Sequence, residues 1–184
     1  MSKLNIGIIQ GSVREGRNGN QVAEYILEKA NLRNDANYEL VDLADYDLPL
    51  LGSKHTTEAQ GADIVAWKNK LAEFDAYVFI TPEYNHALGG ALKNATDYIQ
   101  GETANKAAGF VGYGSLGGTR AHENMRLILA ELQVATVRTA VTFSFMADFE
   151  NFSIFKPADY HQANIDGMLD QVIAWGTALK PLRD

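Results

Sequence analysis

Short apolar runs alternate along the chain with longer stretches in which apolar residues recur at every third or fourth position. The short runs predict five strands, at residues 4–10, 38–43, 76–81, 107–113 and 134–142. The periodic stretches predict five amphipathic helices. Their apolar stripes are Val22, Ile26 and Ala30; Ile64, Trp67, Leu71 and Phe74; Leu88, Ala91, Leu92, Ala95, Tyr98 and Ile99; Met125, Ile128, Leu129 and Leu132; and Ile165, Met168, Leu169, Val172, Trp175, Gly176 and Leu179.

This alternation of strands and helices predicts an α/β fold with three layers, in which helices cover both faces of a five-stranded parallel sheet. Residues 76–80 are apolar throughout, as expected of a central strand, whereas 134–142 carries more polar residues and suits an edge. We expect the strand order 2-1-3-4-5, because the compact, turn-rich loops after strands 1, 3 and 4 would then line one crevice. No repeat or linker divides the chain, so residues 1–184 are predicted to form a single domain.

Composition narrows the possible functions. The 184 residues carry a net charge of −7, which argues against broad nucleic-acid binding. The chain has no cysteine, and this excludes disulfides, thiolate nucleophiles and cysteine-ligated metals. No apolar run approaches the roughly 20 residues of a membrane span, and the N-terminal pattern is not that of a signal peptide. We therefore expect a cytoplasmic protein without a membrane partner.

The loop after the first strand, GSVREGRNGN at residues 11–20, is rich in glycine and basic residues and opens onto a predicted helix. Gly11 and Gly16 have the spacing of a nucleotide P-loop, but Arg17 and Asn18 stand where that motif needs Lys and Ser or Thr. The third strand also lacks a magnesium-binding aspartate at its end. A nucleoside triphosphatase is therefore disfavoured, and a dinucleotide dehydrogenase is too, because the G-x-G-x-x-G fingerprint is absent.

This first loop suits a single terminal phosphate group. Ser12 offers a hydroxyl, Arg14 and Arg17 offer forked charged donors, and residues 16–21 offer backbone N–H groups at a helix N-terminus. The alternative is a solvated turn in which both arginines merely face water. Two arginines and three glycines within ten residues favour phosphate binding.

Two further loops follow the third and fourth strands. In the second loop, Pro82 stiffens the turn, Tyr84 offers an aromatic ring to a flat ligand, and Asn85 can cap a helix that starts near residue 87. The plainer alternative is that Tyr84 packs on its own helix and Asn85 is only a cap. In the third loop, residues 114–118 are mostly glycine, so that the backbone can approach a heterocycle or simply form a turn. Together the three loops describe a site for a flat, singly phosphorylated cofactor, and FMN fits it best.

Three segments carry a resemblance to a known family: GSVREGRNGNQVA, TPEYNHALGGALKNATD and GSLGGTRA, in that order along the chain. They resemble the NADPH-dependent FMN reductase family, which includes the flavodoxin-like quinone, azo and chromate reductases. DLPLL at residues 47–51 is also similar to the family's segment after its second strand. The resemblance implies a flavodoxin-like fold that holds the FMN phosphate in the first loop and the isoalloxazine between the second and third loops.

Carried over residue by residue, the resemblance implies a set of cofactor-binding positions. They are Ser12, Arg14, Asn20 and Gln21 in the first loop; Pro82, Glu83, Tyr84 and Asn85 in the second; and Gly114, Ser115, Gly117 and Gly118 in the third. The predicted cofactor-binding set also includes Arg17 and Gly19. The sequence departs from many family members at Arg17, where they have Ser or Thr, and at Gly19, where they have Asn. We interpret Arg17 as a replacement phosphate ligand.

The expected activity is transfer of reducing equivalents from NADPH or NADH, through bound FMN, to quinones, azo compounds, free flavin or metal oxyanions. We nominate no catalytic side chain and no metal site, because flavin carries the chemistry and the four histidines show no paired ligand spacing. His86 either lies near the ring or is a helix-start or interface residue. The alternatives are an FMN electron carrier or redox sensor without NAD(P)H turnover, and a nucleoside-processing hydrolase. The resemblance also implies a homodimer or homotetramer.

Overall fold

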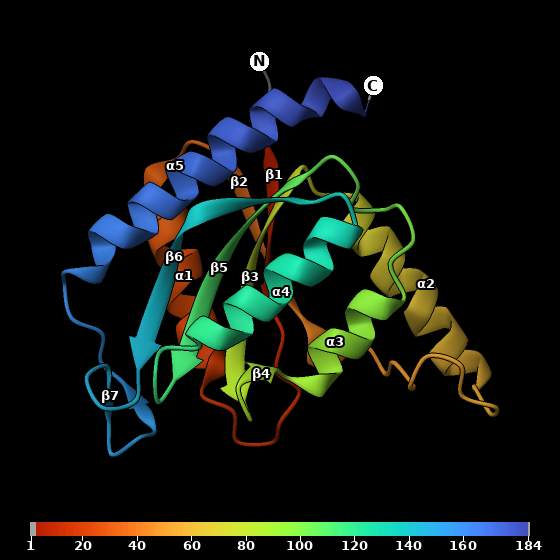
Figure 1. Cartoon of the computed structure of the whole chain (residues 1–184), viewed down its shortest axis with the longest axis horizontal. Coiled ribbons are helices and arrows are strands. Elements are labelled where there is room, and N and C mark those ends of the chain that lie inside the picture. The colour runs from red at the N-terminus through yellow and green to blue at the C-terminus, as the bar shows by residue number, and fades with distance from the viewer. Residues whose placement is uncertain (1–2, 184) are drawn as a thin grey trace.

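The computed structural model describes residues 3–183, which form a central sheet with helices on both of its faces (Figure 1). The parallel strands are β1 (Asn5–Gln10), β2 (Asn37–Asp42), β3 (Ala76–Tyr84), β5 (Ala107–Gly114) and β6 (Ala135–Ser144). The helices are α1 (Gly19–Arg33), α2 (Glu58–Ala72), α3 (Gly90–Asp97), α4 (Thr119–Glu131) and α5 (His161–Leu179). The short elements are β4 (Ala87–Leu88), β7 (Phe149–Glu150), β8 (Ile154–Phe155) and the 3₁₀ turns η1 (Leu43–Asp45) and η2 (Lys180–Leu182).

The five parallel strands lie in the order β2-β1-β3-β5-β6, so the predicted order of the five apolar runs is confirmed. β6 lies at one edge, as its polar residues suggested. The strand count differs from the prediction, because the main sheet has a sixth member, β4, which pairs antiparallel with the end of β3. Within residues 3–183, no helix combines the length and apolar composition that crossing a membrane requires.

The predicted helix start near residue 87 is wrong. Asn85 and His86 both have positive φ, 49° and 66°, which is the backbone that a tight two-residue hairpin turn requires. The chain therefore reverses at these residues and Leu88 joins the short strand β4. Helix α3 begins only at Gly90, with Gly89 as its N-cap, so Asn85 forms the turn and does not cap a helix.

Two apolar layers hold the helices to the sheet, because alternate side chains of each strand point to opposite faces. One layer joins the sheet to α1 and α5 through Ile6, Ile8, Val78, Ile80, Val22, Ile26, Ile165 and Met168. The other joins it to α2, α3 and α4 through Ile9, Phe79, Phe110, Trp67, Leu71, Leu92 and Met125. The Trp67 indole N–H also donates to the carbonyl of Ala95 at 2.9 Å, which ties α2 to α3.

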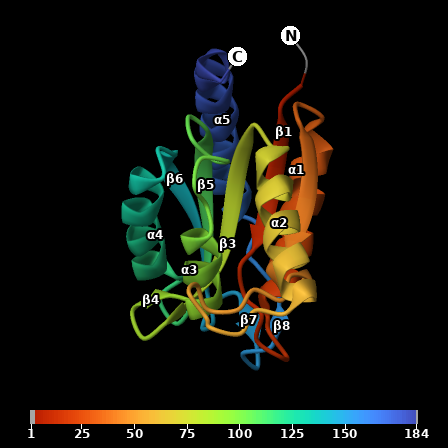
Figure 2. The ribbon, with the colours of Figure 1, turned by 90° about the vertical axis from the view of Figure 1, so that its right-hand side faces the viewer.

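All carboxyl ends of the parallel strands meet at one edge of the sheet, the lower edge in Figure 1. The β1–α1 loop, β4 and the β7–β8 hairpin all lie at that edge, as the turned view in Figure 2 also shows. The beginning of β1 and the end of η2 lie at the opposite edge. The three loops that the sequence singled out are therefore brought to the same end of the molecule.

His122 of α4 is buried directly beneath this edge. Its side chain is 3% exposed and stacks on Phe110, with 5.5 Å between the ring centroids. A Cβ at Gly112 would lie 2.4 Å from His122 Nε2, so the glycine leaves the space that the ring occupies. Burial, with a smaller contribution from the Arg126 charge, lowers the pKa of His122 to about 4.

We predict that His122 makes the protein sensitive to acid. The unfolded chain takes up the proton near pH 6.5 and the folded chain only near its pKa of about 4, so stability falls as the pH drops through this range. From pH 7 to pH 4.5 the loss is about 2–3 kcal/mol, since one pKa unit corresponds to about 1.4 kcal/mol. Urea unfolding of His122→Phe should show a flatter dependence on pH. The matched control is exposed His55→Phe, which should retain the wild-type dependence; equal slopes for both variants would contradict the prediction.

Candidate functional site

A cavity of about 310 Å³ lies at the carboxyl ends of β1, β3 and β5. Its lining comes from four segments that are far apart in the sequence. They contribute Arg14, Gly16, Arg17 and Asn18; Pro82, Glu83 and Tyr84; Tyr113 and Gly114; and Phe145, Phe152 and Ser153. The three loops chosen from the sequence thus share one cavity. Its fourth wall, which follows β6, was not among the predicted site residues.

The predicted site residues divide into those that line this cavity and those that lie behind it. Arg14, Arg17, Pro82, Glu83, Tyr84 and Gly114 line it. The remaining predicted residues are outside the lining: Ser12, Gly19, Asn20, Gln21, Asn85, Ser115, Gly117 and Gly118. Several of these instead fix the loops that carry the lining residues.

The first loop is organised by Gln10, the last residue of β1. Its buried side-chain amide accepts from the Ser12 N–H at 2.7 Å and donates to the Ser12 carbonyl and to Asn20 Oδ1, both at 3.1 Å. Sequence reasoning missed Gln10; the available signal was a polar residue at the end of an otherwise apolar strand. Its amide, together with the side chain of Asn20, determines the path of the loop between β1 and α1.

Arg17 binds its own loop. Its Nε donates to Asn20 Oδ1 at 2.7 Å, its Nη1 donates to the Ser12 carbonyl at 2.8 Å, and its Nη2 forms an ion pair with Asp42 at the end of β2. Each guanidinium nitrogen therefore has a partner within the protein. The role that the structure describes for Arg17 is to fix the loop, and its contact with a phosphate stays a prediction.

The arginine best placed for a ligand is Arg14. Its side chain is exposed and lines the cavity, and among residues 3–183 its guanidinium makes no hydrogen bond or ion pair. The nearby N-terminus of α1 has no side-chain cap and no acidic residue in its first turn. A charged donor beside an uncapped end of a 15-residue helix is a favourable environment for an anion.

Three hydroxyl groups gather at the same end of the cavity. Ser12 Oγ lies 3.5 Å from the hydroxyl of Tyr84, which reaches across from β3. The Tyr113 hydroxyl is buried without a hydrogen-bond partner among the described residues. Burial raises the pKa of Tyr113, so this hydroxyl keeps its proton and remains a donor. Arg14, this unsatisfied hydroxyl and the helix N-terminus form a donor set that fits a phosphate monoester such as that of FMN.

The second and third loops are joined by a partly buried ion pair. Glu83 accepts from the backbone N–H of Arg120 at 3.0 Å and from Arg120 Nη1 at 2.5 Å. Burial alone would raise the pKa of Glu83, but the bonds from Arg120 outweigh it, so the net effect is a lowered pKa and an ionised carboxylate. This pair connects β3 to the first turn of α4 and fixes the distance between the two loops.

The glycines of the third loop serve close packing. Gly117 and Gly118 have φ of 69° and 75°, a conformation that side chains disfavour. A Cβ at Gly118 would lie 2.8 Å from the Cα of Gly112 on β5. Only glycine allows the loop to lie this close to the strand. Of the predicted glycine-rich wall, Gly114 lines the cavity and Gly117 and Gly118 do not, and contact of this loop with a heterocycle stays a prediction.

This geometry defines an open α/β protein with a cavity at the carboxyl edge of its sheet, whose donor groups suit an anion. Residues 4–148 match the family model described as NADPH-dependent FMN reductase, and the chain therefore belongs to that family. The resemblance inferred from the three loop segments is confirmed. FMN as the cofactor and an NAD(P)H-dependent oxidoreductase as the class of enzyme are confirmed at the level of the family.

Individual relatives agree with this assignment. An NAD(P)H-dependent FMN reductase of Nectria sp is 30% identical over 159 residues, which cover 78% of this chain and 77% of the relative. A quinone reductase of Escherichia coli K12 is 28% identical over 138 residues, 71% of each chain. The structure of FerB, an NAD(P)H:(acceptor) oxidoreductase from Paracoccus denitrificans, superposes with a TM-score of 0.72 at 21% identity and covers 92% of this chain and 97% of FerB. This last likeness supports the flavodoxin-like fold.

We predict that Gly19→Ala disturbs the site through Tyr113. The new Cβ would lie 2.6 Å from the Tyr113 hydroxyl oxygen, and such overpacking costs about 1–3 kcal/mol of unfolding free energy. Tyr113→Phe in the Gly19→Ala background removes that oxygen and should recover most of the loss. Gly61→Ala is the control, because its Cβ would meet open space within helix α2. If urea unfolding shows that the double variant does not recover stability, the clash of the new Cβ with the Tyr113 hydroxyl is not the cause of the loss.

Proposed function

We propose that this protein reduces small-molecule acceptors with NADPH or NADH, through FMN held in the cavity between β1, β3 and β5. The observation that carries the proposal is the joining, in one cavity, of the Arg14 guanidinium, unpartnered among residues 3–183, with the aromatic side chain of Tyr84 and the glycine backbone at Gly114. A charged donor and a flat apolar wall suit the phosphate and the ring of a singly phosphorylated flavin. Family membership and the names of the relatives support the same activity.

In the proposed complex, Arg14, the hydroxyl groups of Ser12 and Tyr113 and the backbone N–H groups at the N-terminus of α1 bind the phosphate. The isoalloxazine lies between residues 82–85 and residues 114–118. Bound FMN supplies the hydride chemistry. The protein's own groups bind and orient: Arg17 holds the phosphate loop, and the Glu83–Arg120 pair holds the two ring-binding loops at a fixed distance.

Quinones are the acceptor class that we place first, because a quinone reductase is among the relatives. Azo compounds, free flavin and metal oxyanions belong to the same proposal. A cytoplasmic location and assembly into a homodimer or homotetramer stay predictions from the sequence. Light scattering on the purified protein measures the assembly.

The visible spectrum of the purified protein, before and after NADPH or NADH, tests the activity. We expect flavin absorption that is bleached by at least one donor under anaerobic conditions and restored by a quinone. A flavin that neither donor bleaches in stopped-flow mixing would favour an electron carrier or redox sensor and overturn the proposed reductase. Purified protein that lacks flavin and takes up no added FMN would remove the basis of the proposal altogether.

The two loop arginines should differ in effect. Arg14→Ala removes one charged contact to the phosphate, worth about 1.5–3 kcal/mol, and should weaken FMN binding while leaving riboflavin binding and protein stability unchanged. Arg17→Ala removes the ion pair of Asp42 and one of the two side-chain donors to the Ser12 carbonyl, so it should weaken the binding of both ligands and lower the unfolding free energy. Fluorescence titration and urea unfolding measure these effects. Equal losses for FMN and riboflavin in Arg14→Ala would mean that the phosphate lies elsewhere.

A further inference from the structure

The chain between β6 and α5 forms a wall of the cavity that the family pattern does not explain. β7 and β8 pair antiparallel, with Phe149 opposite Phe155, and form a small hairpin. Phe152 and Ser153, in the turn of this hairpin, line the cavity. The family model matches residues 4–148 and ends just before the hairpin begins. The β7–β8 hairpin, residues 149–155, therefore lies outside the part of the chain that the family model matches.

Two side chains of the phosphate-binding segment hold the hairpin. Asn18 Nδ2 donates to the carbonyl of Phe152 at 2.8 Å. Gln21 Nε2 donates to the carbonyl of Ser153 at 2.8 Å, and Gln21 Oε1 accepts from the Phe155 N–H at 3.0 Å. Gln21, which the family resemblance assigned to the cofactor, thus binds the hairpin with its side chain. These bonds fix the hairpin turn beside the N-terminus of α1.

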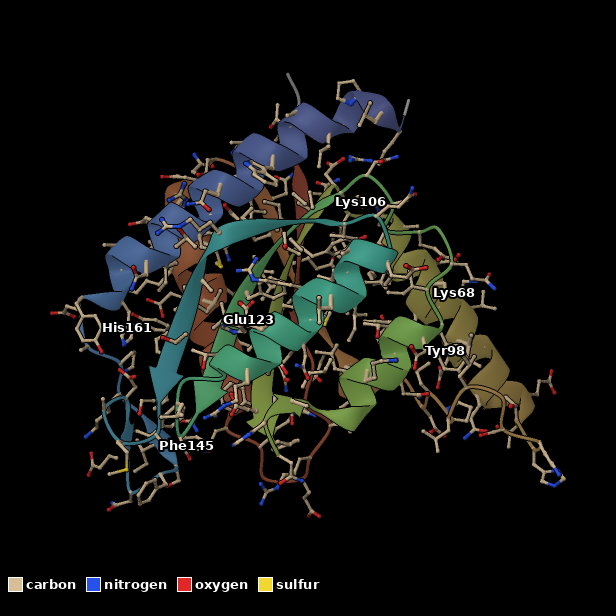
Figure 3. All side chains as sticks on the ribbon, in the orientation of Figure 1. Lys68, Tyr98, Lys106, Glu123, Phe145 and His161 are labelled. Atoms are coloured by element: carbon tan, nitrogen blue, oxygen red, sulfur yellow. The ribbon has the colours of Figure 1, made fainter. Side chains whose placement is uncertain are left out.

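The base of the hairpin is anchored by a buried pair. Asp148 Oδ1 lies 2.7 Å from His161 Nε2, and Asp148 Oδ2 accepts from the Ser144 N–H at 2.8 Å. Both side chains are almost fully buried. Figure 3 places His161 at the start of α5 and Phe145 at the lower end of β6, both on the side where β7 lies, whereas Lys106 lies at the opposite edge. The hairpin is thus held at its base by the Asp148–His161 pair and at its turn by Asn18 and Gln21.

The side chain of Phe152, at the tip of the hairpin, is the apolar part of it that packs least against the protein. Asn151 and Phe152 have positive φ, 51° and 57°, and an aromatic residue in this region is a marked exception. The Phe152 side chain is 61% exposed although it lines the cavity. The positive φ of Phe152 costs conformational free energy, and burial of its ring within the protein does not offset this cost, because the ring is exposed. Backbone outliers of this kind cluster at ligand-binding sites.

We propose that Phe152 closes the phosphate end of the cavity and slows the release of the phosphorylated cofactor. The inference rests on the proposed function, which places the FMN phosphate at Arg14. Asn18 holds the Phe152 backbone beside the first loop, and Phe152 and Arg14 line the same cavity, so the ring is placed to exclude water from the contact between Arg14 and the phosphate. Charged contacts are stronger and less screened by salt when water is excluded.

The test compares the release of FMN and of riboflavin, which lacks the phosphate, from wild-type protein and from Phe152→Ala. We expect FMN to dissociate roughly tenfold faster from the variant, equivalent to about 1.4 kcal/mol, with a much smaller change for riboflavin. FMN affinity should also fall more steeply with salt in the variant. Phe152→Gly accepts the left-handed backbone without strain and should reproduce the effect even where alanine disturbs the turn.

Met146→Ala is the matched control, because Met146 is 77% exposed on the same connecting segment and is not part of the cavity lining. It should release FMN as the wild type does. Gln21→Ala, which cuts the hairpin from α1, should accelerate release in the same direction as Phe152→Ala. Unchanged FMN release in Phe152→Gly, or equal acceleration for FMN and riboflavin, would overturn the inference alone. Failure of the wild-type protein to bind FMN would overturn the proposed function as well.

Discussion

The parallel pairing of β1 with β3, and of β3 with β5, is the constraint on which the site depends. It sets Gln10 opposite Ile80 and Pro82 opposite Tyr113, so three loops leave the sheet at the same level. Parallel strands can be joined only by crossovers, and here helices make them, so each loop also meets the start of a helix or of a hairpin. One register therefore places a helix N-terminus, an aromatic side chain and a glycine-rich turn around a single cavity.

The charges of the cavity edge are divided between holding the site and facing the ligand. Arg17 binds Asn20, Asp42 and the backbone of its own loop. Arg14, in contrast, reaches the cavity without a partner among residues 3–183. Glu83 is likewise bound to Arg120 and held ionised. The polar contacts behind the cavity lining therefore determine the shape of the binding surface. They hold the β1–α1 loop in one conformation before a ligand binds.

Much of the fold could be predicted from the sequence, because buried parallel strands read as apolar runs and helices as periodic stripes. The β3–β4 hairpin was mistaken for a helix start, since Asn85 is equally typical of a cap and of a turn with positive φ. The role of Arg17 was also beyond local reading, because its partner Asp42 lies 25 residues away on a neighbouring strand. The β7–β8 hairpin was not among the elements predicted from the sequence, and the contacts that hold it beside the cavity come from Asn18 and Gln21, more than 130 residues away.

Both ends of the described chain lie on the side of the molecule opposite the cavity (Figures 1 and 2). β1 begins and η2 ends at one edge of the sheet, and the full length of the parallel strands separates this edge from the cavity. A surface or a fusion partner attached at either end would therefore stand behind the sheet. Immobilised in this way, the protein would present its cavity to the solution, and both electron donor and acceptor could diffuse to it unhindered.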